Sequence, residues 1–212
     1  MEPLTLYVDG FWISPYALSA FVALEEKGLP YAVRELKLNK KEHHQGQYLA
    51  HTGRVPALQH GDYWLAESSA ICEYLAETFP FPKHPRLFPE DLRQRGICRE
   101  VQAWLRSDLM AIREERSTHT VWYEHTRQPL SDDGKRAAER LVGIAERLIP
   151  EGNTSLFGPW CIADTDLAMM LQRLNLNGDP MPAKLKAFAE AQWKRPSVVK
   201  WNERVRLPYE KY

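Results

Sequence analysis

The chain of 212 residues lacks several features that would point directly to a partner. Neither charge is in excess, because 28 basic side chains balance 28 acidic ones. Without a net positive charge to attract polyanions, neither nucleic acid nor an anionic membrane surface is an expected partner. The chain also lacks a run of about 18 apolar residues, so the sequence predicts no membrane-spanning helix.

Cysteine is scarce. Cys72, Cys98 and Cys161 are far apart, and none belongs to a CxxC pair or stands beside a histidine at metal-ligand spacing. This pattern indicates neither a disulfide scaffold nor a metal site. Reduced thiols, together with an N-terminus that has no signal-peptide pattern, predict a cytoplasmic location.

The first 80 residues show an alternation of strand and helix patterns. Period-two hydrophobicity or β-rich composition predicts strands over 4–8, 31–38, 55–59 and 63–65. Helical periodicity covers residues 15–27 and 68–79. The polar segment 39–46 predicts an irregular turn or a short helix. The resulting order, β-α-β followed by β-β-α, predicts an α/β domain over residues 1–80.

The rest of the chain has a different character. Residues 81–90 are rich in proline and predict a semi-rigid linker. Helical periodicity then predicts an all-helical domain over residues 91–212. Its predicted helices cover 91–115, 131–149, 164–174, 182–191 and 197–205.

Ser14 stands immediately before the first predicted helix, with Pro15 at the first helical position. The simplest interpretation is an N-cap. A hydroxyl at a helix N-terminus can also donate to a thiolate, which the helix dipole favours. Lowering a thiol pKa from ~8.5 by about two units requires about 2.7 kcal/mol. One charge-assisted hydrogen bond of about 1.5–3 kcal/mol, with the dipole, is sufficient.

Two further short motifs, Val55-Pro56 and Glu67-Ser68, lie where a strand and a helix are predicted to begin. Together with Ser14-Pro15 they are called the three runs below. Val55 precedes Pro56, which could simply start an edge strand. Alternatively, the backbone N–H and C=O of Val55 stay unpaired at a strand edge and bind an extended peptide. Glu67 and Ser68 open a helix, where they could be capping residues, or could bind an ammonium and a carboxylate. A γ-glutamyl end carries both groups, so the three runs predict a glutathione site.

These motifs also resemble known families. Ser14-Pro15-Tyr16-Ala17 resembles the Cys-Pro-Tyr-Cys of glutaredoxins without either sulfur, and Val55-Pro56 resembles the cis Val-Pro of the thioredoxin fold. Over essentially its whole length the chain resembles the cytosolic glutathione transferases. The pattern LYxD…SP…EKGLP is similar to the serine-type classes, such as theta and zeta. The stretches 104–116 and 160–166 resemble the bacterial YfcF-type transferases.

The resemblance implies a thioredoxin-like first domain, glutathione as co-substrate, no metal, and a homodimer. It implies Ser14 as the catalytic serine, Val55 as a backbone clamp, and Glu67 and Ser68 as γ-glutamyl binders. Candidates for binding the glycine carboxylate are Arg54 and, slightly behind it, His43, although either side chain could instead be solvated. Tyr7 is the alternative thiolate partner by comparison with tyrosine-type classes, but its position inside a strand favours a role in the core.

The expected activity is the addition of glutathione to small electrophiles, the reduction of peroxides with glutathione, or both. Two alternatives stay open: a disulfide reductase that uses two glutathione molecules in turn, and a non-catalytic transferase-like module. One departure from the family concerns the buried helix of the second domain. There Cys161 replaces a capping hydroxyl residue while Asp164 is kept, so we expect Asp164 to accept the backbone N–H groups.

Overall fold

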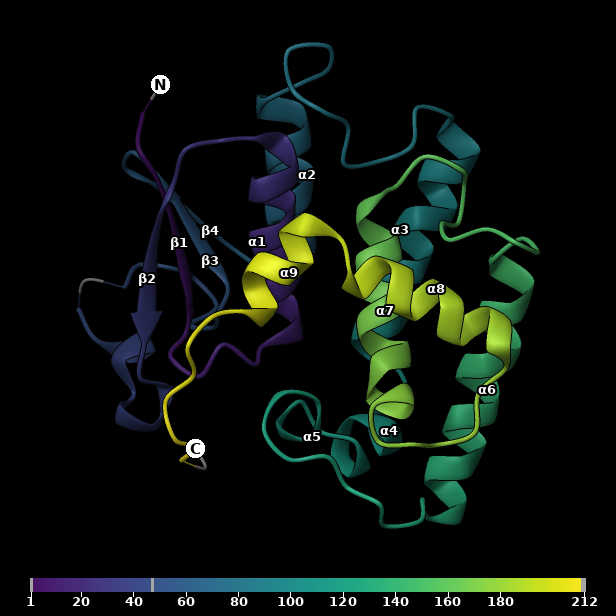
Figure 1. Cartoon of the computed structure of the whole chain (residues 1–212). Coiled ribbons are helices and arrows are strands. Elements are labelled where there is room, and N and C mark those ends of the chain that lie inside the picture. Colours follow the sequence, from purple (N-terminus) through teal and green to yellow (C-terminus); the bar gives the residue numbers. More distant parts are fainter. Residues whose placement is uncertain (1, 47, 211–212) are drawn as a thin grey trace. The chain divides into compact units, whose positions relative to one another are not determined.

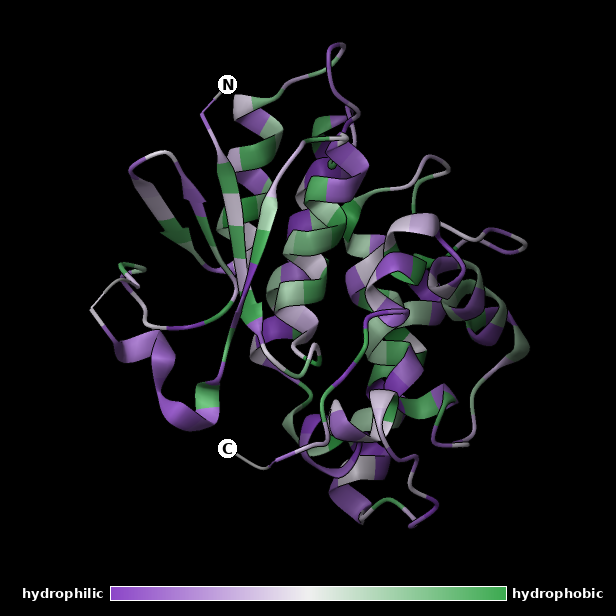
Figure 2. Ribbon diagram, turned by 60° about the vertical axis from the view of Figure 1, so that its left-hand side comes forward, coloured by the Kyte–Doolittle hydropathy of each residue, from purple (hydrophilic) through white to green (hydrophobic). Residues whose placement is uncertain are grey.

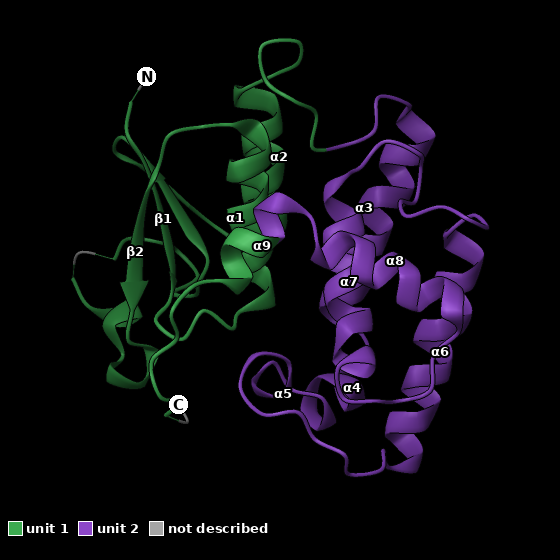
Figure 3. Ribbon diagram, in the orientation of Figure 1, with its two compact units in different colours: residues 1–87, 199–212 green, residues 88–198 purple. Residues whose placement is uncertain are grey.

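The computed structural model describes residues 2–46 and 48–210. The chain divides into two compact units, shown in Figures 1 and 3. The first comprises Met1–Leu87 together with Val199–Tyr212, and the second comprises Phe88–Val198. The structure therefore groups the last residues with the N-terminal unit, whereas the sequence assigns everything after residue 90 to the helical domain.

A four-stranded sheet with the order β2-β1-β3-β4 forms the centre of the first unit. β1 (Leu4–Asp9) runs parallel to β2 (Ala32–Leu36) and antiparallel to β3 (Ala57–His60). β4 (Tyr63–Ala66) is antiparallel to β3. The helix α1 (Pro15–Lys27) connects the two parallel strands, and α2 (Ser68–Thr78) follows β4. The predicted β-α-β, β-β-α order is confirmed.

The core of this unit lies between the sheet and the two helices. Leu4, Leu6 and Val8 alternate along β1 and are buried. Every residue of α1 from Ala17 to Leu24 is also buried, and this helix packs against both β1 and α2. After β2, the short 3-10 helices η1 (Leu38–Lys40) and η2 (Glu42–His44) are mostly hydrophilic (Figure 2). They are the short helical turns predicted for the polar segment.

Trp201 explains why the end of the chain belongs to the first unit. It lies in α9 (Pro196–Asn202) and is fully buried. Its ring centroid lies 4.8 Å from that of Trp12 and 5.4 Å from that of Phe21. Burying a tryptophan of this size contributes on the order of 3–5 kcal/mol. The helical pattern of the last segment gave no indication of this packing partner, because periodicity shows only that a face is apolar.

All the helices and strands described in the second unit are helices, which confirms the predicted all-helical class. They are α3 (Leu92–Ser107), α4 (Met110–Glu115), α5 (His119–Trp122), α6 (Asp132–Leu148), α7 (Ile162–Asn175) and α8 (Ala183–Trp193). Nearly all of α7 is buried, and it packs against α3 and α8. The strongly apolar segment of the sequence is therefore the centre of this unit.

The prediction of one long helix over 91–115 is wrong. The chain leaves the helix at Asp108, and Leu109 takes a left-handed conformation with φ of 61°. The Asp108 carboxylate accepts the Leu109 N–H at 2.7 Å and the Trp104 Nε1–H at 3.1 Å. The bond from Leu109 is the main reason that the pKa of Asp108 lies below its ordinary value. An aspartate side chain that binds the local backbone competes with the helix, which accounts for the break.

Asp164 caps the start of α7, as the sequence predicts. Its carboxylate is fully buried and accepts the N–H groups of Leu156 at 2.7 Å and Cys161 at 2.8 Å. Burial is the largest influence on this carboxyl, and it raises the pKa of Asp164 to about 6 although both hydrogen bonds oppose the rise.

This raised pKa predicts a pH-dependent stability. An unfolded aspartate titrates near ~3.9, so the folded protein binds the Asp164 proton more tightly than the unfolded chain does. Stability from this group is therefore present at low pH and is lost as the pH rises from about 4 to 6. We expect the difference in free energy of unfolding between wild type and Asp164→Asn to fall by up to ~3 kcal/mol between pH 4 and 7 in urea titrations. A difference that does not change with pH would contradict this.

Candidate functional site

Strand pairing brings the three predicted runs to one edge of the sheet. Tyr7 of β1, Ala57 of β3 and Ala66 of β4 form one row across it. Beyond this row β1 leads to Ser14, β4 leads directly to Glu67, and the chain enters β3 from Val55. Because β3 is antiparallel to both neighbours, these three residues leave or enter the sheet at the same edge.

Asp9, the last residue of β1, organises the loop before α1. Its buried carboxylate accepts the Ile13 N–H at 3.0 Å and the Ser14 N–H at 2.9 Å, one on each oxygen. Trp12, which precedes Ile13 in this loop, has φ of 54°, and its N–H donates to the Asp9 carbonyl at 3.1 Å. Burial raises the pKa of Asp9, and the hydrogen bonds from Ile13 and Ser14 oppose that rise. This aspartate therefore determines where Ser14 lies.

Ser14 is the N-cap of α1, as its simplest interpretation predicts. Its backbone is extended, with φ of −71° and ψ of 118°, and Pro15 follows at the start of the helix. The Ser14 Oγ accepts the Ala17 N–H at 3.2 Å. Because the oxygen acts as the acceptor in this bond, the hydroxyl proton can still be donated to a bound molecule.

The Val55–Pro56 peptide bond is cis, as the resemblance implies. Pro56 is buried and Val55 is half-buried. The alternative in which Pro56 simply starts an edge strand is wrong, since β3 starts at Ala57 and lies between β1 and β4. Even so, no backbone hydrogen bond among the described residues uses the N–H or C=O of Val55. The Val55 N–H and C=O therefore remain as a donor and an acceptor with which an extended peptide could pair.

Glu67 precedes α2 in an unusual conformation. Its φ is 69°, its side chain is exposed, and it makes no capping hydrogen bond to the helix. The interpretation of Glu67 as a capping side chain is therefore wrong. Ser68, the first residue of α2, is buried. A non-glycine residue at positive φ costs on the order of 1–3 kcal/mol, and such strain gathers at functional sites.

Other non-glycine residues with positive φ also lie near the sheet edge that carries Ser14, Val55 and Glu67. In the described chain, the non-glycine residues at positive φ are Trp12, Lys41, Glu67 and Leu109. The first three follow the ends of β1, β2 and β4, at the edge where the three runs meet. Leu109 belongs to the helical unit, where Asp108 accounts for it.

The two candidates for the glycine carboxylate lie in different surroundings. His43, in η2, packs on His44 with ring centroids 4.0 Å apart. Burial and the neighbouring His44 lower the pKa of His43, and its Nδ1 is buried without a hydrogen-bond partner among the described residues. Arg54 has an exposed side chain, and its carbonyl accepts the Tyr48 hydroxyl. His43 thus has the more constrained environment, although the sequence ranks it second.

Tyr7 is half-buried in the first unit, and its hydroxyl and its ring both have partners. Its hydroxyl donates to the Gln59 Oε1 at 2.9 Å. Its ring centroid lies 4.8 Å from that of Trp64 and 5.6 Å from that of Tyr48. Burial raises the pKa of Tyr7. The three rings pack against the small residues Ala50, Ala57 and Ala66.

Both units match known family models. Residues 2–77 match the model described as Glutathione S-transferase, N-terminal domain, and residues 91–204 match the one described as Glutathione S-transferase, C-terminal domain. The chain belongs to the glutathione S-transferase family. This agrees with the expectation from the sequence motifs at the level of the superfamily.

Individual relatives differ in their sequence identity to this chain and in how much of each chain the match covers. A crystal structure of a glutathione transferase homolog from Burkholderia gl BGR1, with bound glutathione, is 42% identical and has a TM-score of 0.78. The match covers 94% of this chain and 96% of that one. Human glutathione S-transferase theta-1 is 25% identical over 95% of this chain and 82% of its own length. Mouse theta-3 is 32% identical over 56% of this chain, and the match spans only 47% of the mouse protein.

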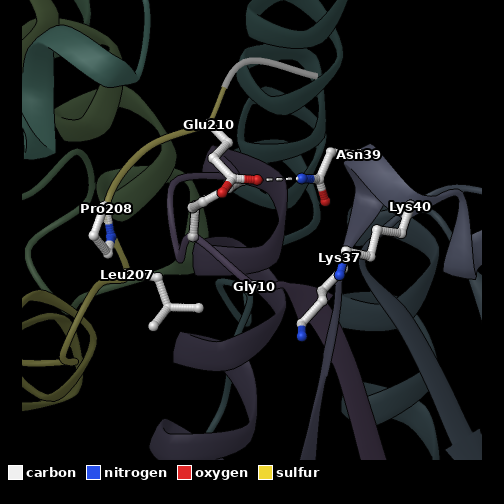
Figure 4. A pocket seen from close by; sticks show the side chains of 8 residues that line it. Gly10, Lys37, Asn39, Lys40, Leu207, Pro208 and Glu210 are labelled. Atoms are coloured by element: carbon white, nitrogen blue, oxygen red, sulfur yellow. Dashed lines mark hydrogen bonds between the residues drawn. The ribbon is translucent and has the colours of Figure 1, made fainter.

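Sequence reasoning missed two features of the first unit. One is Asp9, for which the sequence shows only a turn that precedes the serine at the start of a predicted helix. The other is a pocket of about 280 Å³ at the end of β2 (Figure 4). It is lined by Gly10, Phe11, Lys37, Asn39, Lys40, Leu207, Pro208 and Glu210. No local pattern joins these segments, because the tail comes from the far end of the chain.

Within residues 2–46 and 48–210, no cluster of three or more His, Cys, Asp or Glu side chains is arranged to hold a metal ion. Within the same residues, no helix has the length and hydropathy needed to cross a membrane. Cys72, Cys98 and Cys161 are buried thiols.

The role of Asp9 can be measured through stability. We expect Asp9→Ala to lower the free energy of unfolding by about 1–3 kcal/mol for each of the two N–H groups that it leaves without an acceptor. Urea denaturation of both proteins gives this difference. Asp62→Ala, in an exposed hairpin turn, is the matched control and should change stability by less than about 0.5 kcal/mol. Equal effects of the two substitutions would rule out the organising role of Asp9.

Proposed function

We propose that this protein is a glutathione transferase that binds glutathione along the described sheet edge and uses Ser14 to stabilise its thiolate. One observation carries the proposal: the segments that carry Ser14, Val55 and Glu67 leave or enter the sheet at the same edge, the Val55 main chain is unpaired among the described residues, and the Glu67 carboxylate does not cap α2. The glutathione bound in the Burkholderia homolog supports it.

Each part of the tripeptide has a chemical complement at this edge. The cysteinyl unit pairs antiparallel with the N–H and C=O of Val55. The γ-glutamyl ammonium is paired with Glu67, whose carboxylate the helix does not use. The γ-glutamyl carboxylate accepts from Ser68 and from the N–H groups that start α2. These interactions extend the ligand across β3 and β4 toward Ser14.

The glycine carboxylate requires a donor beyond Val55. Arg54 supplies a guanidinium that is always charged, and His43 supplies a buried ring nitrogen with no partner among the described residues. Burial lowers the pKa of His43, which favours the neutral ring, and a neutral imidazole still has one N–H donor for the carboxylate. We propose that Arg54 provides the positive charge that pairs with this carboxylate and that His43 orients the carboxylate by a hydrogen bond.

Thiolate formation is the main chemical contribution of the protein. The glutathione thiol loses its proton to water, and the Ser14 O–H donates to the resulting sulfur anion. The positive end of the α1 dipole adds to this stabilisation. Ser14 is therefore a hydrogen-bond donor and not a nucleophile, and the chain uses no cysteine of its own in this step. In these respects the proposed enzyme is of the serine type, and the resemblance of residues 104–116 and 160–166 to the YfcF-type transferases supports that subgroup.

The thiolate can then react with a small electrophile or a peroxide. With an electrophile, a sulfur–carbon bond forms, and a leaving group departs or a proton is taken up. With a peroxide, the sulfur attacks one oxygen and the O–O bond breaks, giving an alcohol and a glutathione sulfenic acid. A second glutathione reduces that acid to water and glutathione disulfide. A homodimer in the cytoplasm completes the proposal, by analogy with the family.

The first test replaces the thiolate's partner. We expect Ser14→Ala to lower turnover about tenfold to a hundredfold, because one charge-assisted hydrogen bond of about 1.5–3 kcal/mol is lost. The absorbance of bound glutathione thiolate, followed against pH, should show a raised thiol pKa in the variant. Unchanged turnover with thiolate still formed at neutral pH would refute the assignment.

Ser14 also caps α1, so a second variant separates catalysis from stability. Glycine at an N-cap costs only a few tenths of a kcal/mol, whereas alanine costs about 1. We expect Ser14→Gly to lose as much turnover as Ser14→Ala while keeping more of the helix stability. Turnover that instead follows stability across the two variants would indicate a purely structural serine.

Glu67 is tested through the affinity for glutathione. Glu67→Gln keeps the size and backbone conformation of the residue but removes the charge that faces the ammonium group. We expect the KM for glutathione to rise about tenfold with kcat nearly unchanged, because this binding is the same in the ground and transition states. Steady-state kinetics provide both values. Glu77→Gln, on the exposed end of α2, is the control, and a pure kcat effect at Glu67 would show that its role is different.

A further inference from the structure

Trp12 fixes the loop that leads from β1 to Ser14. It is a bulky residue at φ of 54°, a strained conformation that persists only where the surroundings impose it. Its N–H donates to the Asp9 carbonyl at 3.1 Å, and its Nε1–H donates to the Glu35 Oε1 at 2.9 Å. Asp9 ends β1 and Glu35 belongs to β2. The sheet therefore holds two of the three polar groups of Trp12.

The third polar group, the Trp12 carbonyl, is held by the C-terminal tail, residues 203–210 (yellow in Figure 1). Arg206 donates to this carbonyl through Nε at 3.3 Å and through Nη2 at 3.2 Å. The same guanidinium also donates to three main-chain carbonyls at or just after the end of α9, those of Trp201, Asn202 and Arg204. The last carbonyls of a helix have no partner within the helix. Arg206 therefore joins the end of α9 to the loop before α1.

The ring of Trp12 packs against the same part of the chain. The ring centroid of Trp201 lies 4.8 Å away, and the guanidinium carbon of Arg204 lies 4.6 Å from the centroid of the Trp12 ring. A guanidinium over an indole face makes an attractive cation–π contact, which is stronger away from water. Trp12 is 1% exposed. Residues from the far end of the sequence thus hold both the main chain and the side chain of Trp12.

Arg206 and Asp9 act on the same peptide group. The Trp12 carbonyl and the Ile13 N–H belong to one planar unit. Arg206 binds its oxygen, and the Asp9 carboxylate accepts its N–H at 3.0 Å, so a rotation of the plane would break contacts on both sides. The next amide, the Ser14 N–H, donates to the same carboxylate at 2.9 Å. Asp9 and Arg206 together therefore set the direction in which the chain enters α1.

We propose that Arg206 is a positioning residue for the thiolate: it fixes the Trp12–Ile13 peptide so that the Ser14 hydroxyl faces the glutathione sulfur. This inference rests on the proposed role of Ser14. Without Arg206 the loop relaxes from its strained conformation, and the O–H group loses its alignment with the sulfur. A hydrogen bond weakens steeply as its angle departs from linear. Val55 and Glu67 stand in other segments, so the affinity for glutathione does not depend on Arg206.

Steady-state kinetics separate positioning from binding. We expect Arg206→Ala to lower kcat about tenfold with the KM for glutathione nearly unchanged, because only the alignment of the reacting group is lost. The absorbance of bound thiolate, followed against pH, should show a raised thiol pKa. Arg206→Lys keeps the charge and a donor for the Trp12 carbonyl, so it should fold and lose only about threefold.

Lys200→Ala is the matched control. Lys200 is another cation of the C-terminal segment, and it ties α9 to α1 through an ion pair with Glu25. Its loss should leave kcat and the thiol pKa unchanged. Equal effects of Lys200→Ala and Arg206→Ala on these two quantities would mean that any loosening of α9 has the same result, and would overturn the inference.

A double substitution shows whether Arg206 acts through the serine. In the Ser14→Ala protein the group to be positioned is absent, so Arg206→Ala should lower kcat by less than about twofold. A full tenfold loss in this background as well would place the effect of Arg206 elsewhere and would overturn the inference.

Hydrogen exchange of the ligand-free protein tests the loop without any reference to catalysis. We expect the Ile13 and Ser14 amides to exchange at least about tenfold faster in Arg206→Ala, while the amides of β3 keep their rates. Unchanged exchange at Ile13 and Ser14 overturns the inference. If exchange there rises but Ser14→Ala leaves turnover unchanged, Arg206 still positions the loop and the proposed transferase mechanism fails.

Discussion

The functional features of the first unit depend on the hydrogen bonds that the buried Asp9 carboxylate accepts. Asp9 ends β1 and holds the N–H groups of Ile13 and Ser14, so the loop turns into α1 at a fixed place. Trp12, inside this loop, packs on Trp201 and accepts from Arg206 through its carbonyl. The same turn therefore positions the Ser14 hydroxyl and anchors the tail that walls the pocket. A carboxylate is suited to this task because it accepts two N–H groups at once.

The candidate site contains groups that the fold itself leaves unused. Val55 keeps its main chain unpaired among the described residues, and Glu67 takes a strained backbone without capping α2. The positive φ of Glu67 costs stability, and both features belong to a unit whose core includes α1, buried over most of its length. The well-packed helix and sheet offset this cost. An edge with unpaired main-chain groups, an uncommitted carboxylate and a helix N-terminus is what an extended, charged tripeptide requires.

Local patterns predict those parts of the structure that local forces determine. Periodicity predicted the elements and their order, and the Ser-Pro and Glu-Ser pairs correctly marked two helix starts. The patterns failed where distant segments decide the outcome. The break at Asp108 depends on a side chain that competes with its own helix, and the position of Val55 depends on a strand order that no local run encodes. Trp201 and the pocket lining require the tail to return to β1, which periodicity cannot show.

The most direct test is a crystal structure of the protein soaked with glutathione. We expect the glutathione sulfur within hydrogen-bond distance of the Ser14 Oγ, the cysteinyl backbone paired with Val55, and the contact between Asp9 and the Ser14 N–H intact. A sulfur that lies beside the Tyr7 hydroxyl, or glutathione bound away from this sheet edge, would contradict it.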